Sequence, residues 1–237
     1  MKERNACNMV FTLSFFRSLK SSFTLYSLPS SKKRILLRIG TIILAAGDSS
    51  RMGGEPKQLI SYKGQSLLRR VTESALALQR GPVVVVLGAN RAQIVPELSG
   101  LPITLVDNSS WPTGQASSLK TGLAALYIIN KDIDAVLVLH TDQPLVSLGL
   151  LQHMVDVQNE EGKGIVACRY DTQISVPALF HRDYINELLQ LEGDKGVKWV
   201  IVRHRNDCSE VPFEAGSIDL DSRRDLDLFQ QVITDTL

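Results

Sequence analysis

The sequence predicts an α/β fold, with a mostly parallel sheet that carries helices on both faces. From residue 39 onward, short apolar runs alternate with amphipathic segments, which is typical of successive βαβ units. The apolar runs are nearly continuous in Val, Ile and Leu, as in strands that are buried on both faces. Such units have right-handed crossovers and give a mostly parallel sheet that is covered on both sides. Neither an internal repeat nor a Gly/Ser-rich linker interrupts residues 39–237, so we expect a single domain there.

Each expected element follows from its own pattern. The expected strands are the apolar runs at 41–46, 83–88, 103–106, 135–140, 164–168 and 176–180. The expected helices are the amphipathic segments at 66–80, 117–129, 149–158, 184–191 and 223–232. We expect Asp183 to cap the fourth helix, and Ser222 with Asp225 to form a capping box for the last.

The composition fits a globular chain with a sizeable core, because 44% of the 237 residues are hydrophobic. No run of 18 apolar residues occurs, so the sequence predicts no membrane-spanning helix. Cys7, Cys168 and Cys208 form no CxxC pair, which favours a reducing, cytoplasmic location.

The charge is unevenly distributed along the chain. The first 38 residues carry eight Lys/Arg and one acid, whereas the rest carries 18 basic and 24 acidic residues. An acidic domain has no general attraction for nucleic acid, and we expect neither nucleic acid nor a membrane as a partner. The basic, Ser-rich residues 1–38 are expected to be a disordered or non-native extension, although a targeting peptide has a similar composition.

The most informative segment, residues 44–57, directly follows the first expected strand and has the sequence LAAGDSSRMGGEPK. In an open α/β sheet, ligands bind at the carboxyl ends of the strands. Small residues let backbone N–H groups approach phosphate oxygens, and Arg51 and Lys57 add charge suited to a triphosphate. The spacing excludes the GxGxxG and GxxxxGK[ST] phosphate loops. On composition alone, an ordinary βα turn is the alternative.

This segment resembles the signature of the MobA-like nucleotidyltransferases, LAAGxSxRMG followed by PK and an apolar pair. Within that family it is most similar to the molybdenum cofactor (molybdopterin) cytidylyltransferases. One departure exists, because Gly54 and Glu55 stand where the family usually has one residue. The resemblance implies a Rossmann-like fold of the nucleotide-diphospho-sugar transferase type.

The resemblance extends to residues 108–120, which are similar to the family's Gly-x-Ser-Ser-Ser-Leu segment with Ala116 in place of one Ser. Guanylyltransferase relatives typically have LAGG where this chain has LAAG. The resemblance therefore favours CTP, because the methyl group of Ala46 occupies space that a larger purine needs. Ser117 has an alternative role as a helix N-cap. The implied nucleotide-binding residues are Leu44, Ala45, Ala46, Gly47, Ser49, Arg51, Lys57, Asn108, Gly114, Ser117 and Ser118.

Carboxylates follow two later elements. Asp142 comes just after the expected strand 135–140, at the ligand edge of the sheet, and Mg²⁺ prefers one or two carboxylates plus phosphate oxygens. The resemblance implies that Asp142 holds Mg²⁺, or Mn²⁺ in its place, with Asp221 or Asp219 as the second ligand. The alternatives are caps of a turn and of the last helix. We expect His140 and the other three histidines to be structural, since no pair has helical ligand spacing.

The acceptor side also has counterparts in the family. Residues 193–196, with the sequence GDKG, resemble a family segment that lies near the acceptor, which implies that Asp194, Lys195 and Gly196 bind it. A turn that closes the preceding helix is the alternative.

The sequence thus predicts a Mg-dependent transfer of CMP from CTP to a phosphorylated acceptor, with release of pyrophosphate. Arg51, Lys57 and Asp142 are the expected catalytic residues. The resemblance implies a molybdopterin-type acceptor, and a molybdoenzyme or its chaperone as a partner. The alternatives are a transferase that acts on a sugar or polyol phosphate, and a noncatalytic pterin carrier or chaperone. A carrier would be expected to lack one of the three catalytic residues, and all three are present.

Overall fold

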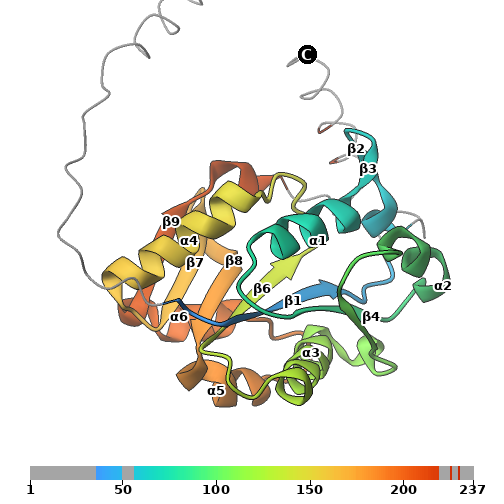
Figure 1. The fold of residues 1–237 in the computed structure, drawn as a ribbon. Helices are drawn as coiled ribbons and strands as arrows, with labels where there is room; N and C mark the ends of the chain where they lie inside the picture. Colours follow the sequence, from blue (N-terminus) through green and yellow to red (C-terminus); the bar gives the residue numbers. More distant parts are fainter. Residues whose placement is uncertain (1–35, 50–55, 219–224, 226–228, 230–237) are drawn as a thin grey trace, which may run out of the picture. The chain divides into compact units, whose positions relative to one another are not determined.

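A computed structural model describes residues 36–49, 56–218, 225 and 229 (Figure 1). All of them belong to the second of two compact units, Ile35–Leu237. Residues 1–35 of the expected extension, Arg51, and the acids Asp219 and Asp221 lie outside the described residues, as does most of the expected last helix.

Seven strands form one sheet in the order β5-β4-β1-β6-β8-β7-β9. Strand β8 is antiparallel to both of its neighbours, and the other pairings are parallel, so the mostly parallel sheet is confirmed. The strands are β1 (Ile39–Ala45), β4 (Val83–Leu87), β5 (Thr104–Asp107), β6 (Ala135–His140), β7 (Ile165–Tyr170), β8 (Gln173–His181) and β9 (Cys208–Pro212). A separate hairpin pairs β2 (Ser61–Tyr62) with β3 (Gln65–Ser66).

Helices cover both faces of the sheet (Figure 1). The α-helices are α1 (Leu67–Ala77), α2 (Arg91–Ile94), α3 (Gln115–Ile129), α4 (Leu148–Glu161), α5 (Ile185–Leu189) and α6 (Lys198–Arg203). Short 3-10 turns are η3 (Lys57–Leu59), η4 (Val95–Leu98), η5 (Trp111–Thr113), η6 (Arg182–Tyr184), η7 (Arg205–Asp207) and η8 (Glu214–Ser217). One core cluster joins the sheet to α1 and α4, and a second joins it to α3, α5 and α6.

Strand β1 shows why the apolar runs are continuous. Ile39 and Ile43 belong to the cluster under α1 and α4, whereas Ile42 belongs to the cluster under α3. Successive side chains of a strand point to opposite faces, and here both faces are buried. Capping fixes the helices around this strand, because Ser66 Oγ accepts a hydrogen bond from the Arg69 backbone N–H at the start of α1 (3.2 Å).

Several local features differ from the sequence expectations. Strand β9 and helix α6 were not expected, and the run at 176–180 is the second half of a hairpin strand. Asp183 does not cap α5, whose N-cap position is Tyr184 without a side-chain bond. The Asp183 carboxylate instead lies 2.9 Å from Nδ1 of His181. Within the part of the chain that the structure describes, none of the helices could cross a bilayer.

Candidate active site

The carboxyl edge of the sheet carries a cavity of 390 Å³ between the segment after β1 and the start of α3. Strands β1 and β6 are parallel neighbours, with Leu44 opposite His140, so the segments that follow them lie side by side. The lining residues are Leu44, Ala46, Gly47, Lys57, Gln58, Trp111, Pro112, Gly114, Gln115, Ser118, His140, Thr141, Asp142 and Asp194. Much of the predicted nucleotide-binding set therefore meets around one hollow.

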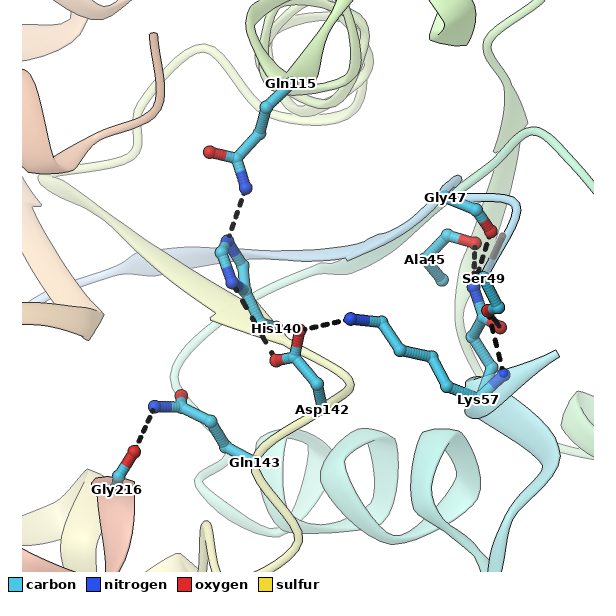
Figure 2. A network of polar contacts seen from close by, with 10 residues as sticks. Ala45, Gly47, Ser49, Lys57, Gln115, His140, Asp142, Gln143 and Gly216 are labelled. Carbon is cyan, nitrogen blue, oxygen red and sulfur yellow. Dashed lines mark hydrogen bonds and ion pairs between the residues drawn. The ribbon is translucent and has the colours of Figure 1, made fainter. Parts of the chain in front are cut away.

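Lys57 and Asp142 form an ion pair in this cavity (Figure 2). The Lys57 Nζ atom lies 2.7 Å from Asp142 Oδ2, and the two side chains are 18% and 13% exposed. Burial raises the pKa of Asp142, but the neighbouring His140 and Lys57 outweigh burial and hold the pKa of this carboxyl below its usual range. Asp142 is therefore ionised at neutral pH.

Gln58 ties the loop after β1 together through side-chain hydrogen bonds. Its side chain is buried, and Nε2 donates to the carbonyl oxygens of Ala45 (3.1 Å) and Gly47 (3.0 Å). Ser49 Oγ donates to Gln58 Oε1 (3.4 Å) and accepts from the Lys57 backbone N–H (2.9 Å). Sequence reasoning missed Gln58, although a lone polar residue between Lys57 and an apolar pair was an available signal. Ser49 acts here through the loop, because its hydroxyl bonds within it.

The start of α3 is tied to the residues before it. Buried Asn108 donates through Nδ2 to the hydroxyls of Ser117 (2.8 Å) and Ser118 (2.9 Å). The Ser117 hydroxyl donates in turn to the Gly114 carbonyl oxygen (2.9 Å). Gly114 has φ of 112°, and a Cβ there would overlap the backbone of Gly193. Of these predicted residues, Gly114 and Ser118 line the cavity, while Asn108 and Ser117 support its wall.

A second cavity of 270 Å³ adjoins the first. Its walls come from the end of β6, the β7–β8 hairpin and η8, and its lining residues are His140, Asp142, Gln143, Tyr170, Asp171, Gln173, Ser175, Val176, Gly216 and Ser217. His140 and Asp142 line both cavities, so the carboxylate lies where the two hollows meet. Of the predicted site residues that the structure describes, only Asp142 lines this second hollow.

Two glutamines position the groups on either side of Asp142 (Figure 2). Gln143 is buried and donates through Nε2 to the carbonyl oxygens of Val176 (3.1 Å) and Gly216 (3.4 Å), which ties the end of β6 to β8 and η8. Gln115 reaches from the first turn of α3, and its Nε2 lies 2.9 Å from Nε2 of His140. His140 Nδ1 faces Asp142 Oδ1 at 3.9 Å.

The GDKG segment is divided among three surroundings. Asp194 lines the larger cavity. Lys195 places Nζ 5.2 Å from the centre of the Trp199 ring, beside a separate hollow between α5 and α6. Gly196 packs against the Gln115 side chain. Neither Asp194 nor Lys195 lines the second cavity.

Asp142 is an acid at these cavities that could hold a divalent cation. The described residues contain no cluster of three or more His, Cys, Asp or Glu side chains that could enclose a metal ion. A hard cation needs only one or two carboxylates when phosphate oxygens complete its shell, and Asp142 presents carboxylate oxygens at the junction of the cavities. The donor chemistry therefore fits Mg²⁺ or Mn²⁺.

A family model and two relatives match parts of this chain. The MobA-like NTP transferase domain matches residues 41–208. The chain is 36% identical over 107 residues to nicotine blue oxidoreductase of Paenarthrobacter nicotinovorans, which covers 45% of this chain and 50% of that protein. It is 34% identical over 131 residues to the bifunctional protein GlmU of Francisella tularensis subsp. novicida, which covers 54% and 27%. The chain thus spans half or less of the length of these relatives.

Among solved structures, the fold is similar to that of Rv0371c from Mycobacterium tuberculosis. The identity is 26% and the TM-score 0.67, covering 82% of this chain and 98% of that one. The same protein in complex with manganese is similar with a TM-score of 0.63 at 26% identity, covering 80% and 96%.

Proposed function

The chain belongs to the MobA-like NTP transferase family, and from this premise we propose that it transfers CMP from CTP to a phosphorylated small molecule, with release of pyrophosphate. The observation that carries the proposal is the Lys57–Asp142 pair at the junction of two cavities. One cavity is the proposed site of the nucleotide and the other of the acceptor, so the reacting groups would meet beside this pair.

The nucleotide would occupy the larger cavity. Gly47 and the backbone around it offer N–H groups to the phosphates, and Lys57 offers a partly buried cation. Ala46 and Trp111 line the same hollow and would face the base. Ala46 is buried, so its methyl group limits the space beside the β1 edge, in support of CTP over a purine nucleotide.

The reaction would be an in-line displacement. An oxygen of the acceptor phosphate forms a bond to the α-phosphorus of CTP, and the bond from that phosphorus to the bridging oxygen of pyrophosphate breaks. Lys57 would neutralise charge that builds on the departing pyrophosphate, with Arg51 as a second cation. Asp142 would hold Mg²⁺ or Mn²⁺, which supplies further neutralisation of the phosphate charges. No covalent enzyme intermediate is needed, because the enzyme would act by positioning the reactants and neutralising their charge.

The acceptor would occupy the smaller cavity, beside Tyr170 and Gln173 of the β7–β8 hairpin. We propose a molybdopterin-type acceptor, on the strength of the resemblance of residues 44–57 to the cytidylyltransferases, with a molybdoenzyme or its chaperone receiving the product. A sugar or polyol phosphate is the alternative within the same chemistry. A noncatalytic pterin carrier is the alternative of another class.

The test is incubation with each NTP and Mg²⁺ or Mn²⁺, with pyrophosphate release scored for molybdopterin and for sugar and polyol phosphates. We expect release with CTP and molybdopterin, and none from Asp142→Asn. Release only with a sugar phosphate would select the first alternative. Binding of molybdopterin without release from any NTP would select the carrier.

A second candidate function is an oxidoreductase activity, favoured by the 36% identity to nicotine blue oxidoreductase. It would require an electron donor in the larger cavity. Oxidation of NADH or NADPH, followed by its absorbance in the presence of an organic dye, would reveal it. Oxidation of the electron donor without pyrophosphate release would support an oxidoreductase activity and contradict the proposed transfer of CMP.

A further inference from the structure

Trp111 brings an aromatic ring into the larger cavity from the segment that follows β5. It is half-buried, so part of its surface stays open to a ligand in that hollow. The strand order β5-β4-β1 puts β4 between the strand that precedes Trp111 and the strand that precedes Ala46. Both residues line the same cavity, so Trp111 lies beside the carboxyl end of β4.

Gly88 directly follows β4 and leaves the space that the indole uses. A Cβ atom at Gly88 would lie 2.8 Å from both Cγ and Cδ1 of Trp111, and 2.7 Å from the carbonyl oxygen of Ala46. Carbon atoms in favourable contact are about 3.5–4.0 Å apart, so a side chain at this position would displace the indole. The φ of Gly88 lies outside the left-handed region, so glycine is needed here for close packing and not for its backbone conformation.

The backbone around Trp111 is fixed by hydrogen bonds within the protein. The Trp111 N–H donates to the Asn108 carbonyl oxygen (3.3 Å), and the Gly114 N–H donates to the Trp111 carbonyl oxygen (3.2 Å). The Asn108 N–H donates in turn to the carbonyl oxygen of Leu87, the last residue of β4 (2.8 Å). The indole is therefore held on a rigid support, and a ligand that contacts it pays little for ordering it.

The larger cavity has two kinds of lining. Gly47 and Lys57 belong to the loop after β1, where the proposed function places the phosphates. The aromatic residues among those that line this cavity are Trp111 and His140, and His140 also lines the smaller cavity. A flat aromatic surface suits the other end of a nucleotide, because every nucleobase presents a π face that can stack.

We propose that the base of the bound nucleoside triphosphate stacks on the indole of Trp111, and that Gly88 is a positioning residue that lets the indole lie beside Ala46. The presence of a nucleotide in the larger cavity rests on the proposed function. The two residues beside the base then have different roles. Stacking tolerates any base, so Trp111 contributes affinity, whereas the methyl group of Ala46 contributes the choice among bases.

The first test is tryptophan fluorescence, because the chain has only two tryptophans. Trp199→Phe leaves Trp111 as the single indole, and Trp199 is 58% exposed and lines a separate hollow between α5 and α6. In this variant CTP with Mg²⁺ should quench the emission with saturation, because a stacked base quenches indole fluorescence. Inorganic triphosphate should compete with CTP but leave the emission unchanged. Emission of Trp111 that does not respond to CTP would overturn the proposal.

The matched control for this experiment is Trp111→Phe, which keeps Trp199 as the single indole. Its emission should show no saturable change with CTP, since Trp199 does not line the larger cavity. Quenching of Trp199 equal to that of Trp111 would show an effect of CTP that does not depend on stacking, and would also overturn the proposal.

The second test is the affinity for nucleotides, measured by calorimetry without an acceptor. Trp111→Leu should weaken the binding of CTP and of GTP by about 5–150-fold each, the usual contribution of one stacked base, and leave the ratio of their dissociation constants unchanged. Trp111→Phe should lose less, because it keeps an aromatic ring. The affinity for inorganic triphosphate should not change in either variant. If Trp111→Leu weakens triphosphate as much as CTP, the indole supports the phosphate loop and the proposal is wrong.

Gly88→Ala tests the positioning role. It should reduce the quenching of Trp111 and weaken CTP binding, and the double variant with Trp111→Leu should be no worse than the weaker single variant, since both changes remove one stacking contact. The control is Gly149→Ala on α4, where an added Cβ would meet only Ser147 Oγ, at 3.9 Å, and CTP binding should equal that of the wild type. Full additivity in the double variant would refute the role of Gly88, and the Trp111 variants test the stacking itself even if Gly88→Ala does not fold.

These results separate the inference from the proposed function. Saturable quenching of Trp111 and loss of affinity in Trp111→Leu, without pyrophosphate release for any acceptor, would mean that the proposed transfer is wrong and that the stacking stands. Pyrophosphate release from CTP with no response of Trp111 would support the transfer and overturn the stacking.

Discussion

The Lys57 Nζ atom and the Asp142 Oδ2 atom are 2.7 Å apart, although 85 positions separate the two residues in the chain. The pair joins the loop after β1 to the end of β6, two neighbouring strands whose carboxyl ends coincide. Each partner is mostly buried, so the charges act on one another through little water.

Substitutions of Asp142 and Lys57 should impair the enzyme in different ways. Asp142→Asn keeps the size but removes the charge proposed to hold the metal, so nucleotide binding should lose its magnesium dependence and turnover should collapse. Lys57→Ala should lower turnover about 10²–10³-fold, the usual cost of one preorganised charge contact. Steady-state pyrophosphate release and CTP titrations with and without Mg²⁺ measure both effects. Near-normal turnover and unchanged magnesium dependence in Asp142→Asn would contradict the site assignment.

Gln58→Leu should damage the loop after β1 with little change in volume. The carbonyl oxygens of Ala45 and Gly47 would lose their donor, at a cost of about 1–3 kcal/mol in the free energy of unfolding. The KM for CTP should rise more than the KM for the acceptor, because the loop lines the larger cavity. Urea unfolding and steady-state kinetics are the measurements. The control is Gln152→Leu on α4, which loses one hydrogen bond to Asp156, and equal effects in both variants would refute this role.

Ala46→Gly should relax the preference for CTP over GTP without abolishing activity. One methyl group in a pocket is worth about 1–3 kcal/mol of discrimination, or about tenfold to 200-fold in the ratio of kcat/KM values. The ratio is measured with both nucleotides on one acceptor. Equal wild-type turnover with CTP and GTP would remove the basis of this prediction.

Tyr184→Phe should alter the pH dependence of stability through its bond with Asp207. The Tyr184 hydroxyl donates to Asp207 Oδ2 at 2.6 Å, and burial together with that carboxylate raises the pKa of Tyr184 to about 12. The same hydroxyl, with the Gly164 N–H, lowers the pKa of Asp207. The contribution of Tyr184 to the free energy of unfolding is fully present below about pH 10, the ordinary pKa of tyrosine. It is lost as pH rises through about 12.

The contribution of Asp207 to the free energy of unfolding changes with pH in the opposite direction. It is complete above the ordinary carboxyl value of about 3.9 and is lost as pH falls through the lowered pKa. Thermal melting of Tyr184→Phe should therefore be lower than that of the wild type at neutral pH, by an amount that shrinks in acid and in strong alkali. A difference that stays constant from acid to alkali would show that the hydroxyl bond contributes nothing.

A chain that begins at Arg38 should fold and remain active, as expected if residues 1–37 lie outside the domain. Arg38 keeps the contacts that anchor the start of β1, since its backbone N–H and its Nε atom donate to Asp134 Oδ2 at 2.9 and 3.2 Å. A cooperative thermal transition and wild-type turnover are the expected results. A chain that begins at Thr41 is the control, because it lacks the contacts of Arg38 and two paired residues of β1. Loss of the cooperative transition in the longer chain would place the extension within the core.

Continuous apolar runs made the central strands predictable from the sequence, because these strands depend on local pattern. The site loop was predicted instead from its resemblance to the signature of the MobA-like nucleotidyltransferases. Strand β9 was not predictable, since its edge position lets Glu210 and Pro212 interrupt the apolar run. The direction of β8 leaves no trace in side-chain pattern, although seven residues between the expected strands 164–168 and 176–180 are too few for a parallel crossover.

Gln115 and His140 could not be paired from the sequence, because 25 positions separate them and only the fold brings the two side chains together. Their individual patterns were ordinary, a polar residue in the first turn of one helix and a histidine at the end of one strand. The shape of the second cavity could not be predicted for the same reason, since its walls combine three elements that no single motif spans.

Because strand β8 is antiparallel to both of its neighbours, one part of the site is built by a short hairpin turn. The β7–β8 turn at Asp171 and Thr172 lies at the carboxyl edge and reaches the smaller cavity without any crossover helix. Insertions or deletions at such a turn leave the pairing of β6 with β8 unchanged. A change at this one hairpin tip would therefore alter the proposed acceptor cavity while the proposed nucleotide cavity stays the same.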